Sequence, residues 1–219
     1  MKIFFDVDGV LIDGWHARPE RRKPWDATLE EDLGVDKDRF QQLFFQKRAD
    51  GRPSLMEECL TGARGLKAAL AEILPLVGHR GSVDEFITYW FRKDSNINRD
   101  VLDIVSSLSN KPGIELYIAT GQEHLRADFL WQQLDFQRYF RDIFYSAKVG
   151  YLKKDPAFFK AVNRALKIDT REKPLFFDDQ PEIVNLAKQA GWDAVVYETI
   201  DDVRNHPRIV PGSGLINGN

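Results

Sequence analysis

The first thirteen residues constrain the fold more than any other stretch of the chain. Residues 3–5 are a continuous apolar run, which is typical of a strand buried on both faces, as in a parallel sheet. The run leads directly into Asp6-Val-Asp8-Gly9. Because ligands of open α/β sheets bind at the carboxyl ends of the strands, two carboxylates here predict a functional site. Gly9 allows a sharp turn and leaves backbone N–H groups free to face an anion.

Similar apolar runs return in the second half of the chain, where they alternate with helical patterns. We predict strands at residues 114–119, 142–145, 175–177 and 194–197. Before one of the helices, Asp155-Pro156 combines an N-cap residue with a proline at the first helical position. Strands that alternate with helices predict a parallel sheet with right-handed crossovers. The fold class is therefore α/β, with a Rossmann-like parallel sheet as its core.

The span from residue 14 to residue 93 has a different character. Its apolar residues recur at helical spacing and show no strand pattern, and Ser82-Val-Asp-Glu85 predicts a capping box at the start of a helix. Because the span follows the first strand, we predict an inserted all-helical cap domain over the carboxyl edge of the sheet. The predicted division is a core of residues 1–13 and 94–205, a cap of residues 14–93 and a polar, Gly-rich tail of residues 206–219.

The composition limits the partners and the compartment. A net charge of −3 and a pI near 5.9 show no excess of basic residues that would bind a polyanion, so we expect no nucleic-acid partner. No stretch approaches the ~18 apolar residues of a membrane span, and Asp6 and Asp8 interrupt the first apolar run, which excludes a signal-peptide core. Cys59 is the single cysteine, which excludes an internal disulfide. We expect a cytoplasmic monomer or homodimer without membrane contact.

Three further strand ends carry residue types that suit phosphate chemistry. Thr120 and Gly121 offer a hydroxyl group and a free backbone N–H group. The lysines Lys148, Lys153 and Lys154 precede a helix, and the charge of one of them would offset the repulsion between a phosphate and a carboxylate. Asp178 and Asp179 are adjacent carboxylates, whose mutual repulsion is best explained by a hard cation such as Mg²⁺.

Together the four strand ends resemble, in order, the four motifs of the haloacid dehalogenase-like hydrolase superfamily. Asp6-Val-Asp8-Gly-Val-Leu11 resembles the first motif, and Ser146–Pro156 resembles Ser-x-x-x-Gly-x-x-Lys-Pro-Asp-Pro, the third. The resemblance implies the phosphatase branch with a helical cap. In that branch Asp6 is the nucleophile that forms an aspartyl-phosphate, and Asp8 is the general acid and base. The dehalogenase branch lacks an acid at the position of Asp8, because a halide leaves without a proton.

The resemblance also assigns the remaining site residues. It implies a Mg²⁺ site made of the carboxylates of Asp6, Asp178 and Asp179 and the backbone carbonyl of Asp8, with Asp179 favoured as a direct ligand. It implies a catalytic role for Lys153 beside Asp6 and Asp8. Phosphate binding falls to Gly9, Thr120, Gly121 and Lys153.

Two departures from the family pattern leave choices open. Lys154 stands where the third motif usually has proline, so Lys148 and Lys154 compete with Lys153 for the lysine role. Gly121 stands where the second motif often has Asn. In the cap, basic residues could meet an anionic leaving group, namely Arg18, Arg21, Arg22, Lys47 and Arg48, and the tryptophans Trp15, Trp25 and Trp90 are expected in the cap core.

The sequence thus predicts a Mg²⁺-dependent phosphatase that hydrolyses small phosphorylated metabolites such as sugar phosphates. One alternative is a sugar phosphomutase, which would return the phosphoryl group to a bound product. Another is a non-catalytic binding module on the same scaffold. A receiver domain also gathers acids and a lysine on a parallel sheet, but the insertion and the Asp-x-Asp-Gly string argue against it.

Overall fold

A parallel five-stranded sheet forms the centre of the computed structural model, which describes residues 1–14, 23–169 and 171–210. The strands lie in the order β3-β2-β1-β4-β5. They are β1 (Lys2–Phe5), β2 (Glu115–Thr120), β3 (Asp142–Tyr145), β4 (Leu175–Asp178) and β5 (Asp193–Val196). Each predicted strand is confirmed to within one residue at either end, and the α/β class is confirmed.

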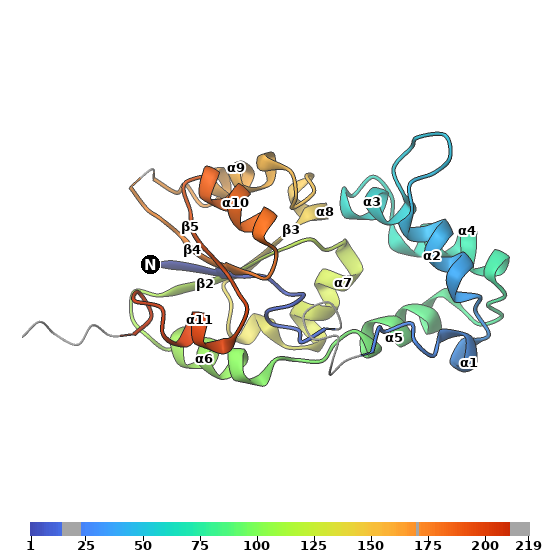
Figure 1. Cartoon of the computed structure of the whole chain (residues 1–219), viewed down its shortest axis with the longest axis horizontal. Helices are drawn as coiled ribbons and strands as arrows, with labels where there is room; N and C mark the ends of the chain where they lie inside the picture. Colours follow the sequence, from blue (N-terminus) through green and yellow to red (C-terminus); the bar gives the residue numbers. More distant parts are fainter. Residues whose placement is uncertain (15–22, 170, 211–219) are drawn as a thin grey trace, which may run out of the picture.

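Helices cover both faces of this sheet (Figure 1). One face packs against α6 (Arg99–Ser109) and α11 (Ile200–Arg204), and the other against α9 (Pro156–Ala165) and α10 (Pro181–Gln189). Alternate side chains of β1 serve the two faces: Phe5 joins the first apolar cluster and Phe4 the second. Burial on both faces explains why this strand reads as an unbroken apolar run.

Shorter helical pieces connect the strands. They are α7 (His124–Asp128), the π-helical turn η2 (Phe129–Gln133), η3 (Phe136–Arg138) and α8 (Ser146–Val149). At the start of α9, the carboxylate of Asp155 accepts from the N–H of Ala157, and Pro156 takes the first helical position, as predicted. At α10 the N-cap is Gln180, so Asp179 does not cap that helix.

In the described part of the segment between β1 and α6, the regular elements are helices joined by loops and turns, without a strand. Its elements are α1 (Leu29–Leu33), α2 (Lys37–Phe45), α3 (Leu55–Leu60), α4 (Leu66–Ile73), η1 (Leu74–Val77) and α5 (Val83–Lys93). Ser82 begins α5 by accepting from the N–H of Glu85, and a reciprocal capping box joins Ser54 and Glu57 at α3. These helices lie to one side of the sheet (Figure 1).

A separate apolar cluster holds these helices together. It includes Phe40, Phe44 and Phe86, with Trp90 stacked on Trp25 at 4.8 Å between ring centroids. Such a cluster is what an independent cap would have, and the division of the chain at residues 13 and 94 stays a prediction. Trp15 and the basic residues Arg18, Arg21 and Arg22 lie outside the described residues.

The end of the described chain packs on the sheet. Ile209 belongs to the apolar cluster beneath α6 and α11, and the ring of His206 contacts Phe177 edge-on at 5.7 Å. The part of the predicted tail that the structure describes therefore contributes to the core, and residues 211–219 lie outside the description. Among the described helices, none is both long and apolar enough to cross a membrane.

Candidate active site

Three carboxylates meet where β1 and β4 end side by side. Asp6 follows β1, and its N–H donates to the carbonyl of Phe177 in β4 at 2.9 Å. This register brings Asp178, the last residue of β4, and its neighbour Asp179 to the same place. Each of the three carboxylates offers an oxygen within 4.8 Å of the others. The topology of the sheet therefore assembles the acids that the sequence places at two separate strand ends.

Gly9 allows these acids to come close. Its φ of +86° is one that L side chains rarely adopt, and a Cβ atom there would lie 2.2 Å from Oδ2 of Asp179. The turn after β1 thus needs glycine both for its backbone conformation and for the space that Asp179 occupies.

Lys153 is the lysine that reaches the carboxylates. Its Nζ lies 2.6 Å from Oδ2 of Asp6 and 2.6 Å from Oδ2 of Asp178, and its side chain is 7% exposed. The Oγ of Ser146 accepts from the Lys153 backbone N–H at 3.0 Å and fixes the loop.

The two rival lysines are engaged elsewhere. Lys148 pairs with Asp142 at 2.7 Å, and Lys154 pairs with Glu57 of helix α3 at 3.0 Å. Of the three lysines, the structure places only Lys153 beside Asp6.

Burial dominates the electrostatics of the site. It raises the pKa of Asp6 well above its ordinary value, although the charge of Lys153 acts in the opposite direction. Burial would lower the pKa of Lys153, but Asp6 and Asp178 together raise it. The pKa of Asp179 rises to about 6, first through burial and then through the charge of Asp178. One lysine thus faces more negative charge than it can balance.

Several polar atoms of the site have no hydrogen-bond partner among the described residues. They include Oδ1 of Asp6, Oδ1 of Asp179 and Oγ1 of Thr120, all buried. Asp178 accepts from the N–H of Gln180 with Oδ1, and its Oδ2, which has no hydrogen bond of good geometry among the described residues, forms an ion pair with Lys153 at 2.6 Å. Buried carboxylate oxygens without partners beside excess negative charge are the donor set that a hard divalent cation prefers. The residues present fit Mg²⁺.

A cavity of about 230 Å³ opens beside these groups. Thr120 ends β2 and Gly121 follows it, so both lie at the same edge of the sheet as Asp6. The cavity is lined from the sheet side by Asp6, Asp8, Thr120, Gly121, Ser146 and Lys153, and from α3 by Glu57 and Leu60. The structure thus brings residues from all four predicted motifs together around one space or its carboxylate floor.

A larger hollow of about 690 Å³ continues from Asp8 and Gly9 beneath the cap helices. Aromatic side chains of the cap, including Trp25 and Trp90, line it together with Asp94. The pKa of Asp94 rises to about 7, mainly through burial and then through the negative charge of Asp8. This space can hold a group larger than phosphate next to Asp8.

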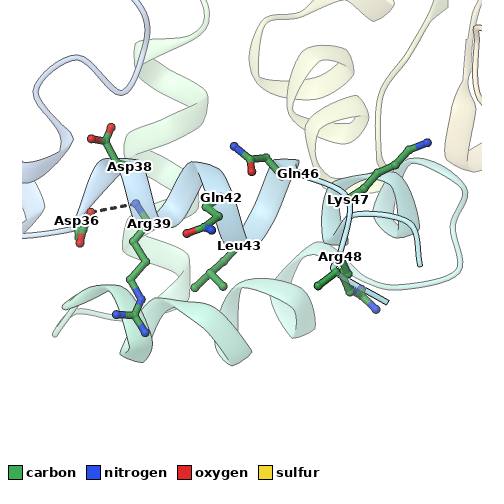
Figure 2. A pocket seen from close by; sticks show the side chains of 9 residues that line it. Asp36, Asp38, Arg39, Gln42, Leu43, Gln46, Lys47 and Arg48 are labelled. Atoms are coloured by element: carbon green, nitrogen blue, oxygen red, sulfur yellow. Dashed lines mark hydrogen bonds between the residues drawn. The ribbon is translucent and has the colours of Figure 1, made fainter. Parts of the chain in front are cut away.

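Lys47 and Arg48, proposed from the sequence as contacts for an anionic leaving group, lie elsewhere. They line a hollow of about 970 Å³ along α2, and neither lines the two cavities at Asp8. Figure 2 shows the two side chains pointing away from each other, with Arg48 turned away from Gln46. Nη2 of Arg48 lies 2.7 Å from Oε2 of Glu58, within the cap. The structure does not bring either residue to the carboxylates.

Three residues of the site region escaped the sequence analysis. Gln122 donates from Nε2 to Oδ2 of Asp8 at 2.5 Å. Glu57 reaches the reactive cavity from the cap. Arg126 is buried and donates to the carbonyl of Phe91 at 2.9 Å, which ties α7 to the end of α5. Gln122 carried a signal, since it follows Thr120-Gly121 at a strand end, whereas Glu57 and Arg126 look like ordinary helix residues.

Comparison with known proteins decides the family. The sequence matches the haloacid dehalogenase-like hydrolases over residues 3–191, most of its length. The chain belongs to this family. No curated protein sequence matches it.

Solved structures of haloacid dehalogenase-like proteins share the fold. A family enzyme of Bacteroides thetaiotaomicron, solved with magnesium and inorganic phosphate, is 16% identical with a TM-score of 0.66, covering 89% of this chain and 92% of that chain. A 2-haloacid dehalogenase of Pseudomonas syringae is 20% identical with a TM-score of 0.61 (93% and 96% covered). A putative β-phosphoglucomutase of Thermotoga maritima is 20% identical with a TM-score of 0.55 (93% and 98% covered).

Two of these structures are named for different activities, a dehalogenase and a putative phosphoglucomutase. At such identities their likeness concerns the fold, and the family makes the chain a hydrolase-type enzyme without naming the leaving group. The choice of reaction has to come from the residues of its own site.

Proposed function

We propose that the chain is a Mg²⁺-dependent phosphatase that acts on small phosphorylated metabolites, such as sugar phosphates, through an aspartyl-phosphate. One observation carries the proposal: a second acid, Asp8, lines the same cavity as Asp6. A halide needs no proton when it leaves, whereas the alkoxide of a phosphate ester does. An acid at this position therefore favours phosphoryl transfer over dehalogenation.

The roles follow from the positions around the cavity. Asp6 has a buried oxygen, Oδ1, without a partner among the described residues, and this atom is the nucleophile toward phosphorus. Asp8 gives a proton to the leaving oxygen and later takes one from water. Lys153 lies against Asp6 and holds the phosphoryl oxygens close to the nucleophile despite their like charges.

The neutral groups complete the phosphate site. The hydroxyl of Thr120 is buried without a hydrogen-bond partner among the described residues, so it is free to donate to a phosphoryl oxygen. The backbone N–H groups near Gly9 and Gly121 are proposed to do the same, at two neighbouring strand ends.

Mg²⁺ would be held by carboxylates of Asp6 and Asp179 and by the backbone carbonyl of Asp8. When bound, it would neutralise charge on the phosphoryl group and the acids. The N–H of Gln180 occupies Oδ1 of Asp178, and Oδ2 is paired with Lys153, so we assign Asp178 to holding the lysine and Asp179 to direct ligation. The related enzyme of Bacteroides thetaiotaomicron, solved with magnesium and inorganic phosphate, supports this choice of cofactor and substrate group.

The cap restricts the substrate to small molecules. Glu57 and Leu60 close one side of the 230 Å³ cavity, and the adjoining 690 Å³ hollow lies beneath the cap helices. A phosphoprotein or polynucleotide would have to displace the cap. The proposal also includes a cytoplasmic monomer or homodimer that uses neither nucleic acid nor membrane as partner.

A panel of small phosphoesters with Mg²⁺, read out as phosphate release, tests the proposal. Asp6→Asn should lose nearly all activity, since removing a covalent nucleophile can cost on the order of a millionfold. Asp142→Asn, an exposed acid on the same sheet, is the control and should stay active. Retention of more than about one per cent activity by Asp6→Asn would reject the nucleophile, since acid–base effects alone span roughly 10²–10⁴.

The same panel separates the alternatives. Conversion of one sugar phosphate into its isomer without free phosphate would identify a phosphomutase, an activity named for the Thermotoga maritima relative. Absence of turnover across the panel would leave a binding module.

A further inference from the structure

Gln122 is a buried residue whose side chain reaches the carboxylate of Asp8. Its Nε2 lies 2.5 Å from Oδ2 of Asp8, and the residue is only 5% exposed. The backbone is held as well, because the carbonyl of Gln122 accepts from the N–H of Ala147 at 3.2 Å. The buried and restrained amide of Gln122 thus contacts one particular oxygen of Asp8, Oδ2.

The chemistry of the two groups fixes the direction of this bond. An ionised carboxylate only accepts, so the NH₂ end of the amide must face it. The hydrogen bond therefore holds Oδ2 toward Gln122 and leaves Oδ1 as the oxygen that can face the substrate.

Another polar side chain near Asp8 is already occupied. Arg126 is close enough for its charge to interact with that of Asp8. Its guanidinium, however, donates to the carbonyls of Phe91 and Asp94 and to the hydroxyl of Ser95. Among the described residues, Gln122 is therefore the neighbour with a side-chain donor directed at Asp8 itself.

We propose that Gln122 is a positioning residue, which turns Oδ1 of Asp8 toward the leaving oxygen of the substrate. This inference rests on the proposed phosphatase function and adds a residue to it. Gln122 lines the 690 Å³ hollow but not the 230 Å³ cavity at Asp6. In this proposal it acts through the orientation of Asp8, which lines both cavities.

Gln122 assists the first of two chemical steps. An oxygen of Asp6 bonds to phosphorus while the bond between phosphorus and the leaving oxygen breaks, and the proton on Oδ1 of Asp8 moves to that oxygen. The products are an alcohol, the aspartyl-phosphate and an ionised Asp8. Water then gives a proton to Asp8 and bonds to phosphorus, which releases inorganic phosphate and Asp6.

The dependence on the leaving group tests this role. An aryl phosphate such as p-nitrophenyl phosphate releases a stable phenolate and needs little proton donation, whereas an alkyl phosphate such as glycerol phosphate needs it. The value to measure is kcat/KM, which contains only the steps through release of the leaving group. Gln122→Met keeps the length of the side chain and removes the donor.

We expect Gln122→Met to lower kcat/KM for the alkyl phosphate roughly tenfold to a hundredfold, a part of the 10²–10⁴ of general acid catalysis. The aryl phosphate should lose less than about threefold, because the same catalysis contributes little there. Asp8→Asn should show the same asymmetry more strongly, and adding Gln122→Met to it should change nothing further. The control is Gln137→Met, which alters an exposed glutamine outside both cavities.

Equal losses on both substrates, or additive losses in the double variant, would overturn the positioning role. Gln122→Leu is a second variant without a donor in case the first does not fold; failure of both to fold would assign the amide to stability and count against the proposal. An unmodified protein that hydrolyses neither phosphate would refute the phosphatase function itself, and the inference with it.

Discussion

Removing the charge of Lys153 should destabilise the protein strongly, quite apart from any effect on catalysis. Nζ of Lys153 contacts Asp6 and Asp178 at 2.6 Å each, and all three side chains are nearly inaccessible to solvent. In Lys153→Met the two carboxylates would remain buried without the cation between them. Loss of one partner from a buried ion pair typically costs about 3–5 kcal/mol.

For a domain of this size, each kcal/mol shifts the melting temperature by roughly 2–4 °C. We therefore expect Lys153→Met to melt about 6–20 °C below the unaltered protein. The loss should be smaller at pH 6 than at pH 8, because Asp6, whose pKa is already raised, can take a proton at the lower pH and remove part of the repulsion.

Urea and thermal unfolding in the presence of EDTA would measure this, since a bound metal could hide the effect. Lys148→Met and Lys154→Met are matched controls from the same segment. Their lysines are 41% and 66% exposed, and their ion pairs should be worth less than about 1 kcal/mol. If Lys153→Met unfolds at the same urea midpoint as Lys148→Met, the buried contacts of Lys153 with Asp6 and Asp178 do not stabilise the fold.

Three further outcomes are expected. Gly9→Ala should abolish the thermal stabilisation by Mg²⁺, because its Cβ atom would lie 2.2 Å from Asp179. Gly121→Ala is the control: the nearest atom to its Cβ would be 3.8 Å away, and the stabilisation by Mg²⁺ should persist in the same thermal-shift assay. The pKa of Asp179 rises from 3.8 to about 6, so the melting temperature of the metal-free protein should fall as the pH rises through that window. The increase in melting temperature on adding Mg²⁺ should grow with pH. Asp179→Asn should flatten both of these dependences on pH. Glu57→Gln, which weakens the exposed pair with Lys154, should change stability by less than about 1 kcal/mol but raise KM for small phosphoesters severalfold; an unchanged KM would show that this contact does not help enclose the substrate.

That the site residues lie close together was predictable from the positions of the strands in the sequence. An apolar run marks a strand, parallel topology brings all carboxyl ends to one edge, and polar residues just beyond the runs must meet there. Asp6, Thr120, Lys153 and Asp178 line or adjoin one cavity for this reason. The sequence left three candidate lysines, and tertiary contacts separated them, since Lys148 and Lys154 found acids of their own.

The contacts of the cap were not predictable. Helical spacing shows which side of a helix is apolar, and Phe40 and Phe44 are buried as their spacing indicates. It does not show which polar residue of the opposite side meets another part of the chain. Glu57 was therefore missed, and Lys47 and Arg48, which could have met a leaving group, lie elsewhere. The direction of a long side chain also escapes sequence patterns: the place of Gln122 after Thr120-Gly121 indicated that it lies near the site, but not that its amide meets Asp8.

The central place of β1 in the sheet has a consequence for the synthesis of the protein. Its two neighbours, Glu115–Thr120 and Leu175–Asp178, emerge from the ribosome long after it does. Until then its backbone edges stay unpaired, whereas the helices between residues 29 and 93 contact mainly one another and can form early. A nascent chain halted before residue 175 would lack Asp178 and carry an apolar strand open to pairing with other chains, so incomplete products should aggregate rather than show partial activity.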